Sequence, residues 1–152
     1  MWYRKLISVV TIVLLASGLY AQTPVETLIE KYKGTDGAKN VLVQGVRMTL
    51  ARRFLENTPV APIASDVEEL AILKMGAVPQ NVRLRFVSDL KTALKTYKYY
   101  GTHPSKNGEV EVYVLPSGLE TVKELVIYNP AVYNLNSFYG DFSVDDLLRL
   151  EK

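Results

Sequence analysis

The single histidine of the chain, His103, is the side chain best suited to proton transfer near neutral pH. Acid–base catalysis needs such a histidine in a cleft, beside a group that orients the ring. His103 stands in the segment Gly-Thr-His-Pro-Ser, which we interpret as a solvent-exposed hairpin turn. The sequence also lacks the Gly-x-Ser-x-Gly turn that presents a nucleophilic serine in many hydrolases. No catalytic residue is therefore predicted.

Three aspartates near the end of the chain, Asp141, Asp145 and Asp146, have the composition of a calcium loop. Counted from Asp141, position six is Asp146 where the EF-hand needs glycine, and position twelve is Lys152 where it needs glutamate. These aspartates are better explained as residues of a helix N-terminus. With no cysteine and one histidine, a typical zinc site cannot form within one chain. Neither a metal site nor a cofactor is predicted.

A pair of carboxylates could still catalyse hydrolysis, because that chemistry needs neither cysteine nor histidine. Two acidic side chains would have to face each other across a groove, about 5–9 Å apart. The candidates are Glu109, Glu111, Glu124, Asp141 and Asp145. A carboxylate-based hydrolase is therefore one alternative function.

Tyrosine is the residue type in clear excess, with ten in the chain. Most of them lie on or beside expected strands, where cross-strand packing of aromatic rings stabilises a sheet. If several share the solvent-exposed face, they form an amphipathic aromatic patch suited to a glycan or a protein partner. The residues of this possible partner-binding patch are Tyr99, Tyr113, Tyr128, Tyr133 and Tyr139.

Arginines concentrate at positions 47, 52, 53, 83 and 85, where they could bind an anionic ligand or form a solvated face neutralised by Glu56, Glu68 and Glu69. The chain carries 18 Lys and Arg against 16 Asp and Glu, a formal charge of +2. Two of the basic residues and none of the acidic ones lie in residues 1–21, so the remainder is neutral. Net charge therefore gives no reason to expect nucleic acid as a partner.

Residues 1–21 have the pattern of a signal peptide: Arg4 and Lys5, an apolar run from Leu6, and small residues before the cleavage site. Cleavage between Ala21 and Gln22 leaves 131 residues. The apolar run is shorter than the roughly 20 residues of a membrane-spanning helix. We expect an exported protein, periplasmic or extracellular, with no stable membrane span after cleavage.

The elements that position these residues follow from periodicity. Thr23 and Glu26 form a capping box at the start of the first helix. Helices are expected at 24–33, 47–56, 79–95 and 144–150, and strands at 40–46, 68–75, 96–102, 109–115, 121–128 and 133–139. Short connections in the second half predict a C-terminal β-meander. Residues 22–152 should form a single α+β domain, a mainly antiparallel sheet with helices packed on one face and a polar second face.

Four stretches also resemble a family of short exported proteins of unknown function from Bacteroides and its relatives. They are Leu-Ile-Glu-Lys-Tyr-Lys-Gly-Thr-Asp-Gly-Ala-Lys-Asn-Val-Leu-Val (28–43), Glu-Val-Glu-Val-Tyr-Val (109–114), Glu-Leu-Val-Ile-Tyr (124–128) and Tyr-Gly-Asp-Phe-Ser-Val-Asp-Asp-Leu-Leu-Arg-Leu (139–150). The resemblance implies a Gram-negative envelope or secreted location and carries over no catalytic residue. Some relatives are lipoproteins, whereas this chain has no cysteine to carry a lipid.

An organised fold without reactive side chains favours a non-enzymatic binding or interaction module that uses the exposed face or an edge of the sheet. The partner is unknown, with an envelope protein or a glycan as candidates. Besides the hydrolase, a regulatory protein of the envelope stress response is an alternative that rests on the family resemblance.

Overall fold

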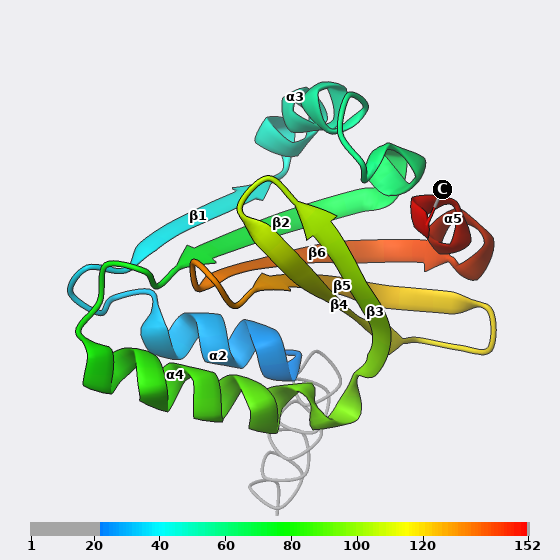
Figure 1. Ribbon diagram of the computed structural model, residues 1–152. Coiled ribbons are helices and arrows are strands. Elements are labelled where there is room, and N and C mark those ends of the chain that lie inside the picture. The colour runs from blue at the N-terminus through cyan, green and yellow to red at the C-terminus, as the bar shows by residue number, and fades with distance from the viewer. Residues whose placement is uncertain (1–21, 152) are drawn as a thin grey trace, which may run out of the picture.

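The computed structural model describes residues 22–151 and begins with the capping box that the sequence predicts. The Thr23 hydroxyl accepts the Glu26 N–H at 3.2 Å, and the Glu26 carboxylate accepts the Thr23 N–H at 3.3 Å. These two bonds start helix α2 (Pro24–Tyr32), which lies beside the longer helix α4 (Gln80–Ala93) (Figure 1). The rings of Tyr32 and Phe86 meet edge to face at 5.4 Å between α2 and α4.

The sheet has six strands in the order β1-β2-β6-β5-β4-β3, and every neighbouring pair is antiparallel. The strands are β1 (Lys39–Gln44), β2 (Val67–Lys74), β3 (Lys98–Ser105), β4 (Gly108–Pro116), β5 (Thr121–Asn129) and β6 (Asn134–Ser143). Strands β3 to β6 form the predicted meander, and β2 adds to the far side of β6. The α+β class and the antiparallel sheet are thus confirmed.

Helices α2 and α4 cover one face of the sheet, which we call the helix face (Figure 1). Phe86 and Leu90 of α4 pack there against strand residues such as Leu73, Val126 and Leu135. All five side chains are buried. Burial of this apolar stripe holds the two helices on the sheet.

The opposite face of the sheet differs from the prediction, because it is apolar rather than polar. Shorter helices lie at its margin: α3 (Val46–Leu55), α5 (Val144–Leu148) and the 3-10 turns η1 (Ala61–Asp66) and η3 (Arg149–Glu151). Met48, Ile63, Leu125, Phe138 and Phe142 form a second core with them. The helices therefore do not all pack on one face.

A further 3-10 turn, η2 (Leu94–Thr96), joins α4 to β3. The β3–β4 hairpin curves so that its tip comes over the middle of the opposite face (Figure 1). None of the helices within residues 22–151 has the length and apolar character needed to cross a bilayer. The predicted signal peptide and the Ala21–Gln22 cleavage site fall at or before the start of the described residues.

Candidate ligand-binding site

The middle of the opposite face carries two rows of side chains that strand register places side by side. Alternate residues of a strand point to the same face. One row runs across the sheet through Ile72, Asn136, Ile127 and Val112, and the next through Leu70, Phe138 and Leu125. Asn136 is the one polar side chain in these two rows.

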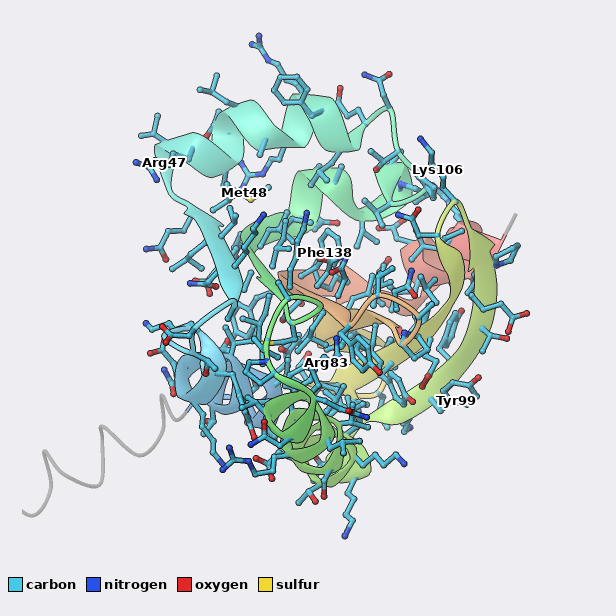
Figure 2. All side chains as sticks on the ribbon, turned by 60° about the vertical axis from the view of Figure 1, so that its left-hand side comes forward. Arg47, Met48, Arg83, Tyr99, Lys106 and Phe138 are labelled. Atoms are coloured by element: carbon cyan, nitrogen blue, oxygen red, sulfur yellow. The ribbon has the colours of Figure 1, made fainter. Side chains whose placement is uncertain are left out.

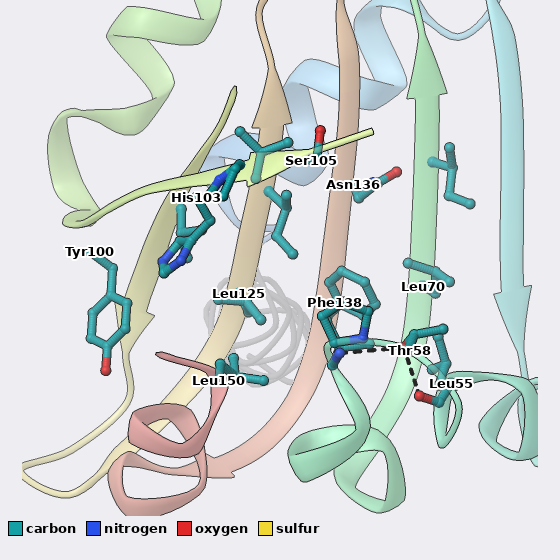
Figure 3. Close-up of a pocket in the computed structure, with 17 residues that line it drawn as sticks. Leu55, Thr58, Leu70, Tyr100, His103, Ser105, Leu125, Asn136, Phe138 and Leu150 are labelled. Atoms are coloured by element: carbon teal, nitrogen blue, oxygen red, sulfur yellow. Dashed lines mark hydrogen bonds between the residues drawn. The ribbon is translucent and has the colours of Figure 1, made fainter. Parts of the chain in front are cut away.

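These rows form the floor of a pocket of about 550 Å³. Its walls come from three other parts of the chain: His103, Pro104 and Ser105 of β3, Leu55 and the loop 58–60 after α3, and Leu150 of η3 (Figure 3). Pockets that bind small molecules in proteins have volumes of roughly 300–1,000 Å³ and are mainly apolar with a few polar groups. The volume and lining of this pocket therefore suit a small, mostly hydrophobic molecule.

Four polar side chains of the pocket differ in whether their hydrogen-bonding groups are available to a ligand. The hydroxyl groups of Ser105 and Thr58 already donate to backbone carbonyls, those of Gly108 and Leu55 respectively. In contrast, the side chains of His103 and Asn136 make no hydrogen bond with any residue of the described chain, and both are half-buried. A polar group of a ligand could therefore bind to them.

The placement of His103 corrects the sequence interpretation. Strand β3 extends to Ser105, so His103 pairs with Val110 inside the hairpin rather than lying in an exposed turn. The pocket contains no carboxylate to orient the imidazole ring. The imidazole ring of His103 therefore has no carboxylate partner among the described residues that line the pocket.

Glu124 forms a second unusual polar site, on the helix face. Its side chain is fully buried, and its carboxylate accepts hydrogen bonds from the Tyr97 hydroxyl and, at 2.6 Å, from the Ser137 hydroxyl. The Tyr97 oxygen also accepts the Val25 N–H at 3.2 Å, which links the start of α2 to the sheet. Burial raises the pKa of Glu124, and these hydrogen bonds only partly offset that effect.

The carboxylates proposed for a hydrolase are not arranged around the pocket. Glu109, Asp141 and Asp145 are exposed, whereas Glu124 is enclosed. Glu111 of β4 pairs with Tyr128 of β5, and Tyr128 lies four residues along β5 from Glu124. At about 3.3 Å per residue, the backbone positions of Glu111 and Glu124 are therefore about 13 Å apart along the strand direction. None of the five lines the pocket.

The five candidate tyrosines do not form one exposed patch. Tyr99 is 59% exposed, and its ring lies 5.3 Å from that of Tyr113. Tyr128 is buried against Phe86, and its burial raises its pKa to about 12. Tyr133 packs under the guanidinium group of Arg83. Tyr139 is half-buried, between the register partners Glu69 and Glu124. Of the five, only Tyr99 is exposed, and the other four are buried or half-buried.

The pocket was not predicted, although the sequence carries a signal for it. The run Leu125-Val-Ile-Tyr128 is apolar at successive positions, which is the pattern of a strand buried on both faces. The run Leu70-Ala-Ile-Leu73 in β2 has the same property. These two runs could have indicated an apolar second face.

Within residues 22–151 no three acidic or histidine side chains gather in a way that could hold a metal ion. Comparison of the chain with protein-family models, with curated proteins and with solved structures finds no match. The pocket geometry is therefore the basis for assigning a function.

Proposed function

We propose that this protein is an exported, non-enzymatic binding protein that holds a hydrophobic small molecule with one polar group in the pocket on the opposite face. The observation that supports this proposal most directly is a cavity of about 550 Å³ whose mainly apolar lining includes side chains of five strands, β2 to β6. A ligand that leaves water for this surface gains about 25 cal/mol per Å² of apolar area buried.

Asn136 and His103 define where the polar group of the ligand binds. The Asn136 amide can donate and accept hydrogen bonds, and a neutral imidazole has one donor and one acceptor nitrogen. A carboxyl, hydroxyl or amide group on the ligand suits both. A glycan fits this pocket poorly, because its many hydroxyl groups would face Leu125, Ile127 and Phe138 without partners.

The lining also supports a binding role over catalysis. The pocket holds one histidine without an orienting carboxylate, and no pair of acidic side chains. Export remains part of the proposal on the strength of the pattern in residues 1–21 alone.

Binding of the fluorescent probe anilinonaphthalene sulfonate tests the proposal. Ile127→Phe adds bulk to the pocket floor and should weaken probe binding at least about tenfold. The matched control is Leu84→Phe, which alters an exposed residue of α4 on the other side of the sheet. Equal probe affinity in the two variants, both folded by circular dichroism, would count against the pocket as a ligand site.

The natural ligand can be sought directly by native mass spectrometry of protein recovered from the exporting cells. We expect an added mass from a compound that organic solvent extracts. The Ile127→Phe variant should carry less of it than the Leu84→Phe variant. A protein that is always recovered empty and binds no apolar probe contradicts the proposed function.

A further inference from the structure

Helix α3 is apolar on two sides, only one of which faces the protein. Met48 points inward and is fully buried. On the outer side Val46, Leu50 and Phe54 are 82%, 59% and 76% exposed. Their spacing of four residues places them along one stripe of the helix surface. We call these three residues the outer stripe.

Arginines lie on both sides of the outer stripe. On a helical projection at 100° per residue, Arg47 follows Phe54 on one flank and Arg53 precedes Val46 on the other. Helix α3 contains no acidic residue. Neither arginine takes part in an ion pair within the described residues, although the sequence offered Glu56, Glu68 and Glu69 as partners. Helix α3 is therefore positively charged, even though the chain after residue 21 has no net charge.

Arg52, the third arginine of α3, has a different role. It faces inward and donates two hydrogen bonds to the Val67 carbonyl, at 2.8 and 3.0 Å. These bonds fix α3 to the start of β2. Helix α3 lies at an edge of the molecule, away from the layer of α2 and α4 (Figures 1 and 2), and its outer stripe is exposed there.

We propose that α3 is a docking helix for an anionic lipid surface. A helix that lies in a membrane interface buries apolar side chains at the boundary of the acyl chains while its basic side chains contact the headgroups. The outer stripe and the flanking arginines match these two layers. The guanidinium groups of Arg47 and Arg53 can bind lipid phosphates in a bidentate manner, which favours a lipid surface over an uncharged apolar partner.

Docking by α3 does not depend on whether the pocket binds a ligand, but it would determine where the pocket lies relative to the lipid surface. Leu55 ends α3, and the loop 58–60 that follows lines the pocket (Figure 3). A protein docked through α3 therefore holds one wall of its pocket close to the lipid surface.

Sedimentation with lipid vesicles tests the proposal. The full chain, including residues 1–21, is expressed, and the protein is purified after any processing of its N-terminus by the cell. Two kinds of vesicle are compared: phosphatidylcholine alone, and equal parts phosphatidylcholine and phosphatidylglycerol. Leu50→Ser/Phe54→Ser should lower the partition coefficient into the anionic vesicles at least about tenfold. The matched control Leu84→Ser/Leu119→Ser removes two other exposed leucines and should change it less than about twofold.

The charge is tested in the same way. Arg47→Gln/Arg53→Gln should lower partitioning into the anionic vesicles at least about tenfold, because each basic residue near an anionic surface contributes about a fivefold effect. Lys91→Gln/Lys95→Gln, which removes one exposed charge in the last turn of α4 and one in η2, is the control.

Three results would overturn the docking proposal. One is equal partitioning of the unaltered protein into both kinds of vesicle, and another is equal partitioning of the stripe variant and its control. The third combines two observations: the protein does not bind vesicles, and α3 cross-links to an envelope protein. If Leu50→Ser/Phe54→Ser abolishes that cross-link, the outer stripe binds a protein partner. Loss of the probe-binding pocket by Ile127→Phe should leave vesicle binding unchanged, so the two proposals fail separately.

Discussion

Glu124 has no access to solvent, so the free energy of ionising its carboxyl group is higher than for an exposed glutamate. Burial raises its pKa above the ordinary value of 4.5. An acid with a higher pKa in the folded state binds its proton more tightly when folded. Its contribution to stability is therefore full below about pH 4.5 and declines as the pH rises through the folded-state pKa.

Glu124→Gln should remove this decline. The free energy of unfolding, measured with urea at several pH values between 4 and 8, should then fall less with rising pH than in the unaltered protein. Glu109→Gln, at an exposed position, is the control and should leave the slope as it is. Parallel slopes for the unaltered protein and Glu124→Gln would show that the carboxyl group titrates alike in the folded and unfolded states.

Tyr97 connects Glu124 to the N-terminus of α2. Tyr97→Phe removes the donor to the Glu124 carboxylate and the acceptor of the Val25 N–H, and leaves two buried polar groups without that partner. We expect a loss of about 2 kcal/mol in the free energy of unfolding, because an unsatisfied buried group costs about 1–3 kcal/mol. Tyr99→Phe, at an exposed ring, should change it by less than about 0.5 kcal/mol in the same urea titrations.

At the scale of elements, local signals predicted the order of helices and strands well. The capping box at Thr23 marked the start of α2. The pair Asn107-Gly108, a sequence typical of hairpin turns, lies where β3 meets β4, and the turn itself is formed by Lys106 and Asn107. Alternation in Glu109 to Leu115 indicated β4, which the structure extends by one residue at each end. These signals are local, because capping and turn geometry depend on residues close together in the sequence.

The pocket could not be predicted in the same way, because it depends on contacts between distant segments. Strand β2 pairs with β6, which brings Ile72 beside Asn136 across more than sixty residues of sequence. Because β3 extends to Ser105, His103 lies in a strand and lines the pocket rather than lying in a loop. Neither the β2–β6 pairing nor the length of β3 is marked by a pattern of neighbouring residues. The apolar runs in β2 and β5 indicate only that a second face of the sheet is buried.

Gly140 allows strand β6 to approach η1, the short helix beside the pocket. A Cβ atom at this position would lie 2.1 Å from the Asp66 carbonyl oxygen, a backbone atom that cannot move aside alone. Gly140→Ala should therefore lower the free energy of unfolding by about 3 kcal/mol, at the upper end of overpacking effects. Gly34→Ala, where no atom lies within 4 Å, should be close to neutral in thermal denaturation. Similar melting temperatures for the two variants contradict this reading of the β6–η1 contact.

For the molecule as a whole, the two faces of the sheet have different roles. The helix face is filled by α2 and α4 around Phe86 and encloses Glu124, so it provides stability. The opposite face is only partly filled by short helices and leaves a pocket. The outer stripe of α3 lies at the margin of that same face. Both proposed binding surfaces thus belong to the side of the sheet that long helices do not cover.

The proposed compartment has a spectroscopic consequence, because Trp2 is the single tryptophan of the chain and lies in residues 1–21. Cleavage after Ala21 should give an exported protein without tryptophan emission and with an intact mass that begins at Gln22. Ala21→Arg replaces the small residue that signal peptidase requires and should preserve both the emission and the longer mass. Gln22→Asn, on the other side of the bond, should still be cleaved. Protein found inside the cytoplasm with Trp2 still attached would refute export, and the pocket would then have to be matched to a cytoplasmic ligand.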